Sequence, residues 1–354
     1  MNNQGKTEYL YEIAILRVAL IILLVLYHAF APYSGAWAPL NGYAEITAYM
    51  WFDKLCYASM LETFVFVSGF VFGYQVRVKG ESKLGFKHLF LNKFRRLMMP
   101  SIVFSFLYIL LLQDIHQPIT KTMYEIIKGV AHMWFLPMLF WCFIFVCLIE
   151  RTRISFKLAF SSAMLFCLLP IPSLPFQLYH VFYYFPFFYV GYFIQKKDIS
   201  LKLNRLYKTQ VVAMLVVAFL ILFPSLTLLR EWAESQMGGG KSDLTKLFTM
   251  TAVKRFSQLI YSLTGLIMML ATVGTYLKKH TKPIPQWIRK TGDLCMGVYL
   301  LQQFLLIILY RHTELPILIN PYLLPWIGTL ATIVISILLS SLIRRTSIGR
   351  SLIG

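Results

Sequence analysis

LYEIAILRVALIILLVLYHAF, residues 10–30, is the stretch that decides the fold, because it is apolar enough to cross a membrane yet carries Arg17 and His28. On an α-helix these two residues, eleven positions apart, project from nearly the same face, separated by roughly 16 Å along the axis. An ionisable side chain within hydrocarbon costs about 2.5 to 3.5 kcal/mol on insertion scales and usually faces protein or a water-filled interior. We therefore expect an inner helix of a membrane bundle.

Two roles for Arg17 and His28 are open. Both could serve a polar site inside the bundle, which is the default interpretation of ionisable residues within a membrane. Alternatively, Arg17 neutralises an acid on a neighbouring helix and His28 is a hydrogen-bonded residue at the membrane surface. The other polar residues of the apolar segments bear on this choice.

The composition indicates a multi-pass membrane protein. Of the 354 residues 58% are hydrophobic and 14% are charged, a balance that a water-soluble surface could hardly accommodate. The net charge of +19 does not indicate nucleic acid, because the Lys and Arg residues lie in short connections between apolar segments. Anionic lipid headgroups and a phosphate-bearing substrate are the natural partners there. The five cysteines form no CxxC pair and no histidine stands at metal spacing, so we expect no metal site.

Ten apolar segments are long enough to cross a hydrocarbon core of about 30 Å. They lie near residues 10–30, 56–76, 97–113, 132–150, 155–172, 178–195, 209–229, 255–277, 294–311 and 322–343. Only the proline-rich turn Pro170–Pro175 separates the fifth segment from the sixth, so those two could be one bent hairpin. We expect one all-α transmembrane domain of about ten helices over residues 1–354, with no appended soluble domain.

The basic residues predict the orientation. Of the 34 Lys and Arg residues, 24 lie before the first segment, after the even-numbered segments or after the last, and 9 lie on the opposite side. Positive residues gather in cytoplasmic connections, so both termini are expected in the cytoplasm of a bacterial-type cell. Arg17 then lies in the inner half of the cell membrane and His28 near its outer surface.

The second segment carries Glu62 at a depth close to that of His28. A carboxyl group beside an imidazole can orient and polarise it, as in acyl-transfer sites. The alternative is that Glu62 is interfacial or pairs with an arginine. Farther along this segment, Ser68, Gly69 and Gly73 permit the close approach of a neighbouring helix.

A basic cluster, KFRRLMMP at residues 93–100, enters the third segment. Lys93 and Arg96 share a helix face and Arg95 lies beside them. Such a cluster can hold phosphate oxygens by charge and by the guanidinium fork, or it can be a simple cytoplasmic anchor. Arg17 favours the phosphate role, because it places another cation above the same cytoplasmic mouth.

The fourth segment opens on the outer side with HMWFLP, residues 132–137. Trp134 could stack on a sugar and His132 could hydrogen-bond its hydroxyls, or both could belong to the aromatic belt of the membrane surface. In the predicted outer loop 230–254, GGGKS at residues 238–242 is not a phosphate-binding loop. The first glycine of that motif would fall at Ser235, and no strand precedes it.

Several motifs together resemble the membrane acyltransferase-3 family. They are R-x10-H at Arg17 and His28, SGF at residues 68–70, the basic run before Pro100, HMWFL at 132–136, FPFFYVGYF at 185–193 and GDLCMGVYLLQ at 292–302. The resemblance covers nearly the whole chain in the family's order. It implies a ten-helix domain that moves an acyl group, commonly acetyl, from cytoplasmic acyl-CoA to a hydroxyl of a carbohydrate or related acceptor.

The resemblance also implies roles for single residues. The family's histidine and arginine map to His28 and Arg17, and its R-x-x-R element maps to Lys93 and Arg96, with lysine replacing the first arginine. Many relatives have a histidine where this chain has Gln302.

We expect the CoA phosphates near Arg17, Lys93, Arg95 and Arg96, and His28 as general base on the acceptor or as a covalent acyl carrier. The alternatives are a transporter or flippase for an anionic or saccharide solute, and a scaffold or sensor without catalysis. We find no convincing inverted repeat of the kind that many transporters show.

Overall fold

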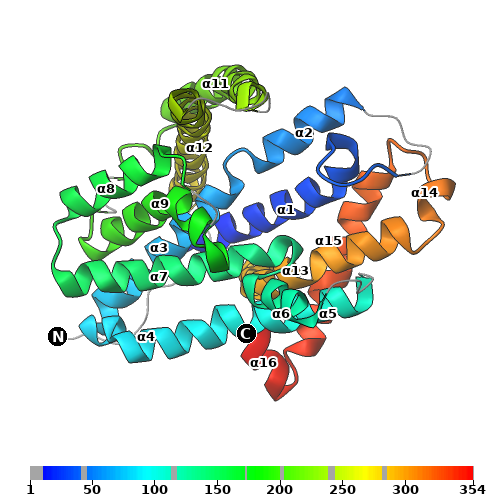
Figure 1. Cartoon of the computed structure of the whole chain (residues 1–354), viewed down its shortest axis with the longest axis horizontal. Helices are drawn as coiled ribbons and strands as arrows, with labels where there is room; N and C mark the ends of the chain where they lie inside the picture. Colours follow the sequence, from blue (N-terminus) through cyan, green and yellow to red (C-terminus); the bar gives the residue numbers. More distant parts are fainter. Residues whose placement is uncertain are drawn as a thin grey trace.

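The computed structural model describes residues 11–40, 46–112, 118–171, 174–199, 203–237, 244–280 and 285–353. Over these ranges the chain is helical and has no strand (Figure 1), so the predicted all-α class is confirmed. Eight helical stretches there are long and apolar enough to cross a membrane. They are α1 (Tyr11–Ser34), α2 with α3 (Thr47–Tyr57, Met60–Lys79), α4 through α5 (Phe86–Lys93, Met99–Leu112), α7 (Phe135–Thr152), α11 (Thr209–Met237), α12 (Leu244–Lys279), α13 (Gln286–Arg311) and α15 (Leu324–Ile343).

The two remaining predicted segments are also helical. Helix α8 (Phe156–Leu168) has 13 residues and α9 (Leu178–Lys196) has 19. A helix of 13 residues is short for a core of about 30 Å, and the tyrosines of α9 lower its hydropathy. The number of ten spans and the orientation of the termini therefore stay predictions. The described residues also form three shorter α-helices, α6 (Ile119–Lys128), α14 (Leu315–Leu318) and α16 (Ser347–Ile353), and three short 3-10 helices.

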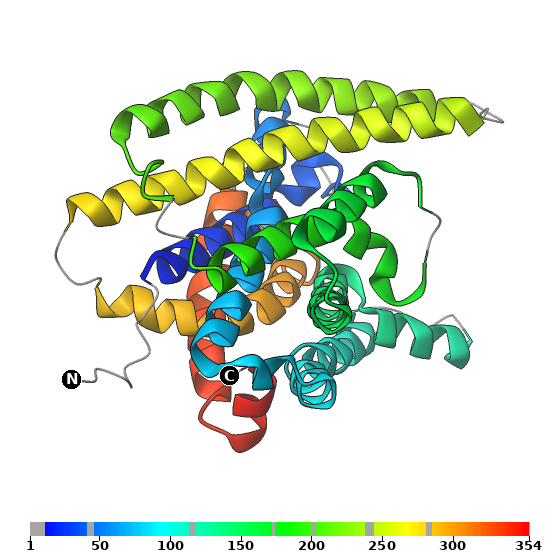
Figure 2. The ribbon, with the colours of Figure 1, turned by 90° about the vertical axis from the view of Figure 1, so that its left-hand side faces the viewer.

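The sequence predicted a loop at residues 230–254, and this prediction is wrong for most of them, because they are helical. Helix α11 continues to Met237 and α12 begins at Leu244, so the two form a long antiparallel pair along one side of the bundle (Figure 2). Ion pairs support the extension, because Lys254 of α12 lies 2.7 Å from Glu234 of α11, and Lys54 of α2 lies 2.6 Å from Glu231. The rejected GGGKS motif, at residues 238–242, lies outside the described residues.

Helices α3 and α9 pack backbone to backbone. A Cβ atom at Gly69 would overlap the main-chain oxygen of Phe188, one at Gly73 that of Tyr192, and one at Gly191 that of Phe66. Only glycine allows this approach, and membrane helices use such small residues to pack closely. Close packing was predicted for Gly69 and Gly73, and the structure shows α9 as their partner.

Replacing Gly69 with alanine should destabilise the protein by about 1 to 3 kcal/mol, because the added methyl group meets rigid backbone. The measurement is the midpoint of thermal unfolding in detergent. Gly292→Ala is the matched control, because a Cβ there meets its nearest atom, the main-chain oxygen of Ala14, at 3.7 Å. Equal midpoints for the two variants would show that the α3–α9 contact tolerates a side chain.

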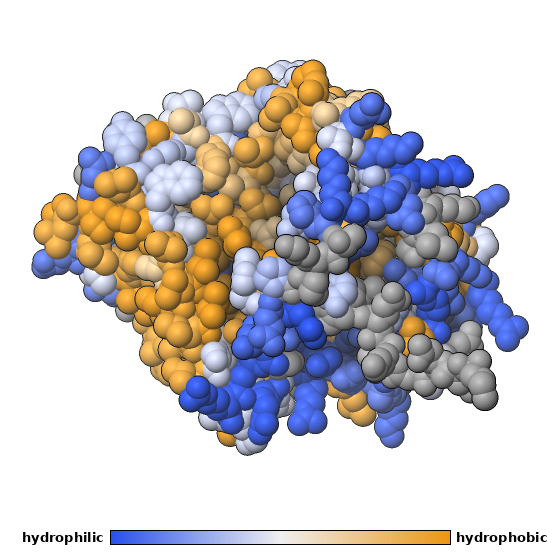
Figure 3. Space-filling model, turned by 180° about the vertical axis from the view of Figure 1, so that it is seen from behind, coloured by the Kyte–Doolittle hydropathy of each residue, from blue (hydrophilic) through white to orange (hydrophobic). Residues whose placement is uncertain are grey.

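The surface has an apolar region beside a hydrophilic one (Figure 3). The exposed apolar side chains include many from α11 and α15, such as Met214, Leu220, Ile221, Leu330 and Leu338. Large apolar side chains left outside a packed core belong against lipid in a membrane protein. The chain is therefore a multi-pass membrane protein.

Helix α1 and the residue after the end of α15 both contact the N-terminal third of α13 at one end of the bundle. Ala14 of α1 lies beside Gly292 of α13, and Arg344, after the end of α15, donates a hydrogen bond from Nη1 to the main-chain oxygen of Asp293 at 3.0 Å. We call this end, with Ala14, Gly292 and Arg344, the terminal side. It is the side on which the basic cavity described below lies.

Candidate active site

A cavity of about 420 Å³ lies between α1, α3, α7 and α13 and reaches the terminal side. Basic side chains dominate its charge. Among the described residues, its wall contains four cations, Arg17, Lys93, Arg96 and Arg344, and one carboxylate, that of Asp293. The three arginines alone outnumber the one carboxylate, and a space partly walled by apolar side chains strengthens their attraction for a polyanionic ligand.

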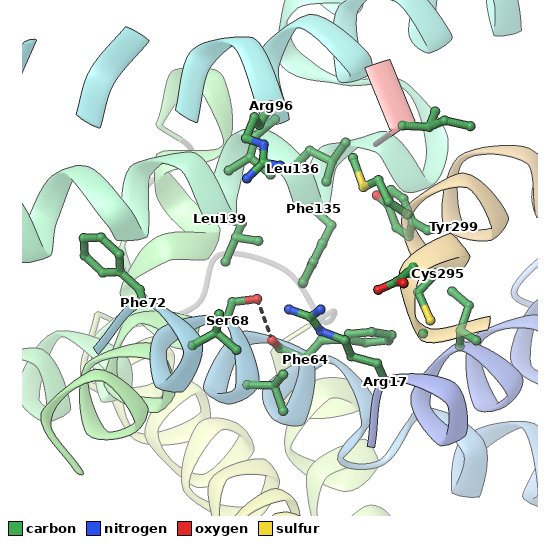
Figure 4. A pocket seen from close by; sticks show the side chains of 18 of the residues that line it. Arg17, Phe64, Ser68, Phe72, Arg96, Phe135, Leu136, Leu139, Cys295 and Tyr299 are labelled. Carbon is green, nitrogen blue, oxygen red and sulfur yellow. Dashed lines mark hydrogen bonds between the residues drawn. The ribbon is translucent and has the colours of Figure 1, made fainter. Parts of the chain in front are cut away.

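Arg17 and Arg96 point into the cavity from opposite walls, with Ser68 of α3 nearby (Figure 4). The Nζ atom of Lys93 lies 3.6 Å from the centre of the Phe143 ring. Within the part of the chain that the structure describes, neither Arg17 nor Lys93 forms an ion pair with a carboxylate. The idea that Arg17 merely neutralises a neighbouring acid therefore has no support from these residues.

A π-helical turn, Phe94–Met98, joins α4 to α5 and carries Arg96. Pro100 has no N–H to donate, so it cannot form the hydrogen bond that a regular α-helix would have at this position. The turn is closed by the N–H of Met99, which donates to the oxygen of Phe94 five residues earlier. Arg95, on the same turn, is exposed and is not part of the cavity wall; its Nε donates to Oγ of Ser351 at 3.3 Å.

The opposite end of the cavity is apolar and includes Leu24, Leu61, Phe64, Phe135 and Tyr299. His28 lies beyond this end, one helical turn after Leu24, and is not part of the wall. Its side chain is buried, with 7% of its surface exposed. The side chain of His28 is therefore inside the protein and does not line the cavity.

His28 is paired with His132, which the sequence placed only near the outer surface. The ring centres lie 6.0 Å apart, and both side chains are buried. Among the described residues, Nδ1 of His28 and both ring nitrogens of His132 have no hydrogen-bond partner. A buried polar group without a partner in the protein calls for an explanation, and a catalytic role is one of them.

Contacts from distant helices hold the turn that carries His132. The main-chain oxygen of His132 accepts a hydrogen bond from the hydroxyl of Tyr299, and its N–H donates to Oε1 of Gln303 at 3.3 Å. Before it, the N–H of Val130 donates to Oγ of Ser105 at 3.1 Å. Tyr299 thus touches both the cavity and the histidine pair, and its ring centre lies 5.2 Å from that of His132.

Trp134 lies outside the cavity. Its ring centre is 4.4 Å from that of His180 and 5.9 Å from that of Tyr184, both on α9. The structure therefore places Trp134 in an aromatic group beside the histidine turn. Its role in sugar binding stays a prediction.

Glu62 is buried, and its hydrogen bonds lead away from His28. Its Oε1 accepts from the hydroxyl of Tyr183 at 3.0 Å and from Nε2 of Gln258 at 3.3 Å, on α9 and α12. The side chains beside the His28 ring include those of Gln302 on α13, Trp37 and His132. The structure thus gives Glu62 partners other than His28, and an orienting role for Glu62 stays untested.

Sequence reasoning missed most of the cavity wall, including the polar residues Asp293, Tyr299 and Arg344. Arg344 was counted only as a cytoplasmic charge, and Asp293 and Tyr299 were noted only as letters of a motif. The motif GDLCMGVYLLQ at residues 292–302 was the available signal, because Gly292, Asp293, Cys295, Met296 and Tyr299 all line the cavity.

Comparison with known proteins supports an enzyme. A family model described as an acyltransferase domain, that of acyltransferase family 3, matches residues 10–345. No match was found among curated proteins or solved structures. The family match spans every helix that contributes to the cavity except α16. The chain therefore belongs to the acyltransferase-3 family and is a membrane acyltransferase.

Proposed function

We propose that the protein transfers an acyl group, acetyl in the simplest case, from cytoplasmic acyl-CoA to a hydroxyl of a cell-surface carbohydrate or lipid-linked glycan. The observation that carries this proposal is the cation-lined cavity, which ends next to a buried histidine pair with unpartnered ring nitrogens. The cation-lined cavity suits a polyanionic donor, and the histidine pair suits a proton transfer.

The donor enters from the terminal side, which we take to face the cytoplasm because most of the basic residues are predicted there. The phosphates of CoA lie against Arg17, Lys93 and Arg96, where a guanidinium can hold two phosphate oxygens at once. The pantetheine arm follows the cavity between α1 and α3, so the thioester comes to rest near Tyr299 and Leu24.

His28 acts as general base. Its free ring nitrogen takes the proton of the acceptor hydroxyl while the hydroxyl oxygen attacks the thioester carbonyl carbon. The carbon–sulfur bond breaks, and the CoA thiolate then takes the proton from the imidazolium. General base catalysis of this kind contributes about 10² to 10⁴ in rate. In a covalent relay, the same nitrogen would first carry the acyl group itself.

Leu24, one helical turn before His28, and Tyr299, which packs against His132, both line the cavity, so we expect them to move when the thioester reaches His28. The hydrogen bond from Tyr299 to the main-chain oxygen of His132 is the contact that this movement would break. The acceptor approaches from the opposite side, where His132, Trp134 and the aromatic group around His180 can meet a sugar.

The test is to incubate purified protein in proteoliposomes with acetyl-CoA labelled in the acetyl group and with candidate glycans. The proposal predicts label on the glycan and release of free CoA. A transporter for an anionic or saccharide solute would instead move the label or the sugar across the bilayer without forming an ester. That outcome would overturn the proposal.

A further inference from the structure

We infer that the C-terminal segment 344–353 is part of the donor site, with Arg344 binding a phosphate group of acyl-CoA and α16 closing the cavity at the terminal side. This inference rests on the proposed function and extends it to Arg344, near the end of the family match at residue 345, and to α16, which lies beyond that match. Arg344 and Ile353 both belong to the cavity wall.

Arg344 is held in position by the start of α13. Its Nη1 donates to the main-chain oxygen of Asp293 at 3.0 Å, which leaves the remaining N–H groups of the guanidinium for a ligand. Arg344 is half-buried, whereas its neighbour Arg345 is exposed and is not part of the wall. Of these two adjacent arginines, only Arg344 lines the cavity in which the donor is proposed to bind.

The chain reverses after α15 so that α16 returns to the cavity. The turn is closed by hydrogen bonds from the N–H of Thr346 to the oxygen of Ile343 and from the N–H of Gly349 to Oγ1 of Thr346. A Cβ at Gly349 would overlap the main-chain oxygen of Ile343, so the return needs glycine. It brings Ile353, with 1% of its surface exposed, into the wall.

Arg95 connects this segment to the basic turn of α4 and α5. Its hydrogen bond to Ser351 joins α16 to the turn that carries Arg96. Arg95, which was predicted from the sequence to bind phosphate, thus contacts the C-terminal helix instead. Arg344 takes its place as the fourth basic residue of the cavity wall.

The experiment compares Arg344→Ala with the matched variant Arg345→Ala, which removes the same charge one residue later. Binding of CoA to the full-length protein in detergent is measured by calorimetry, with thermal unfolding as a check on folding. A lost charge-assisted contact predicts about tenfold weaker binding for Arg344→Ala and affinity close to wild type for Arg345→Ala. If Arg344→Ala does not fold, Arg344→Lys replaces it and should give an intermediate loss, because the charge stays and the fork is lost.

The outcomes separate the two proposals. If the wild type does not bind CoA, the proposed function fails. If the wild type binds CoA and a charge reversal at Arg96 weakens binding, but Arg344→Ala or its lysine substitute behaves like Arg345→Ala, this inference alone is overturned. Deleting residues 347–354 gives an independent check, because removal of the closing helix should speed the release of bound CoA, and an unchanged rate would contradict its closing role.

Discussion

Replacing His28 with alanine should lower acyl transfer by a factor of about 10² to 10⁴ while the affinity for acyl-CoA stays close to that of the wild type. In the proposed mechanism the imidazole removes the proton of the acceptor hydroxyl, but His28 is not part of the cavity wall where the phosphates are proposed to bind. The measurements are the rate of labelled acetyl transfer under saturating donor and the dissociation constant of CoA.

His312→Ala is the control for this variant. His312 follows the end of α13, the same helix that provides Gln302 beside His28, but it is exposed. Its loss should leave transfer unchanged. Undiminished transfer by His28→Ala, in protein that unfolds at the wild-type temperature, would rule out His28 as the base and as the acyl carrier.

Reversing the charge at Arg96 should weaken acyl-CoA binding by a factor of about 100, because a charge-assisted contact is lost and a like charge then faces the phosphates. The effect on transfer should appear mainly in KM and should disappear at saturating donor. It should also shrink as salt is added, since screening weakens both attraction and repulsion.

Lys87→Glu is the matched control for Arg96→Glu. Lys87 lies on α4, close in sequence to Lys93, but unlike Arg96 it is not part of the cavity wall. Both variants change the net charge by the same amount. Equal dissociation constants for the two would mean that the overall charge of the terminal side, and not a phosphate site at Arg96, attracts the donor.

The arrangement within α1 was predictable because helical periodicity is local. Arg17 and His28 were expected on one stripe of an inner helix; Arg17 lines the cavity and His28 is buried beyond its end. The glycines of α3 were predictable in the same way, because small residues in a membrane segment signal close packing.

The histidine pair was not predictable, because long-range contacts create it. His132 meets His28 because its turn is held by Tyr299 and Gln303, about half the chain away in sequence. The depth of Glu62 in the membrane did not identify its hydrogen-bond partners either, because several helices pass at that level. The structure shows that these partners are Tyr183 and Gln258. The charge rule places Arg344 on a side of the membrane but cannot say that it enters a cavity.

The most direct measurement is a structure of the protein with bound acetyl-CoA. The phosphates should lie within hydrogen-bonding distance of Arg17, Arg96 and Arg344, and the thioester should lie past Leu24, next to the imidazole of His28, with Tyr299 displaced. A donor bound outside this cavity, or a thioester still separated from His28 by an unmoved Tyr299, would contradict the mechanism.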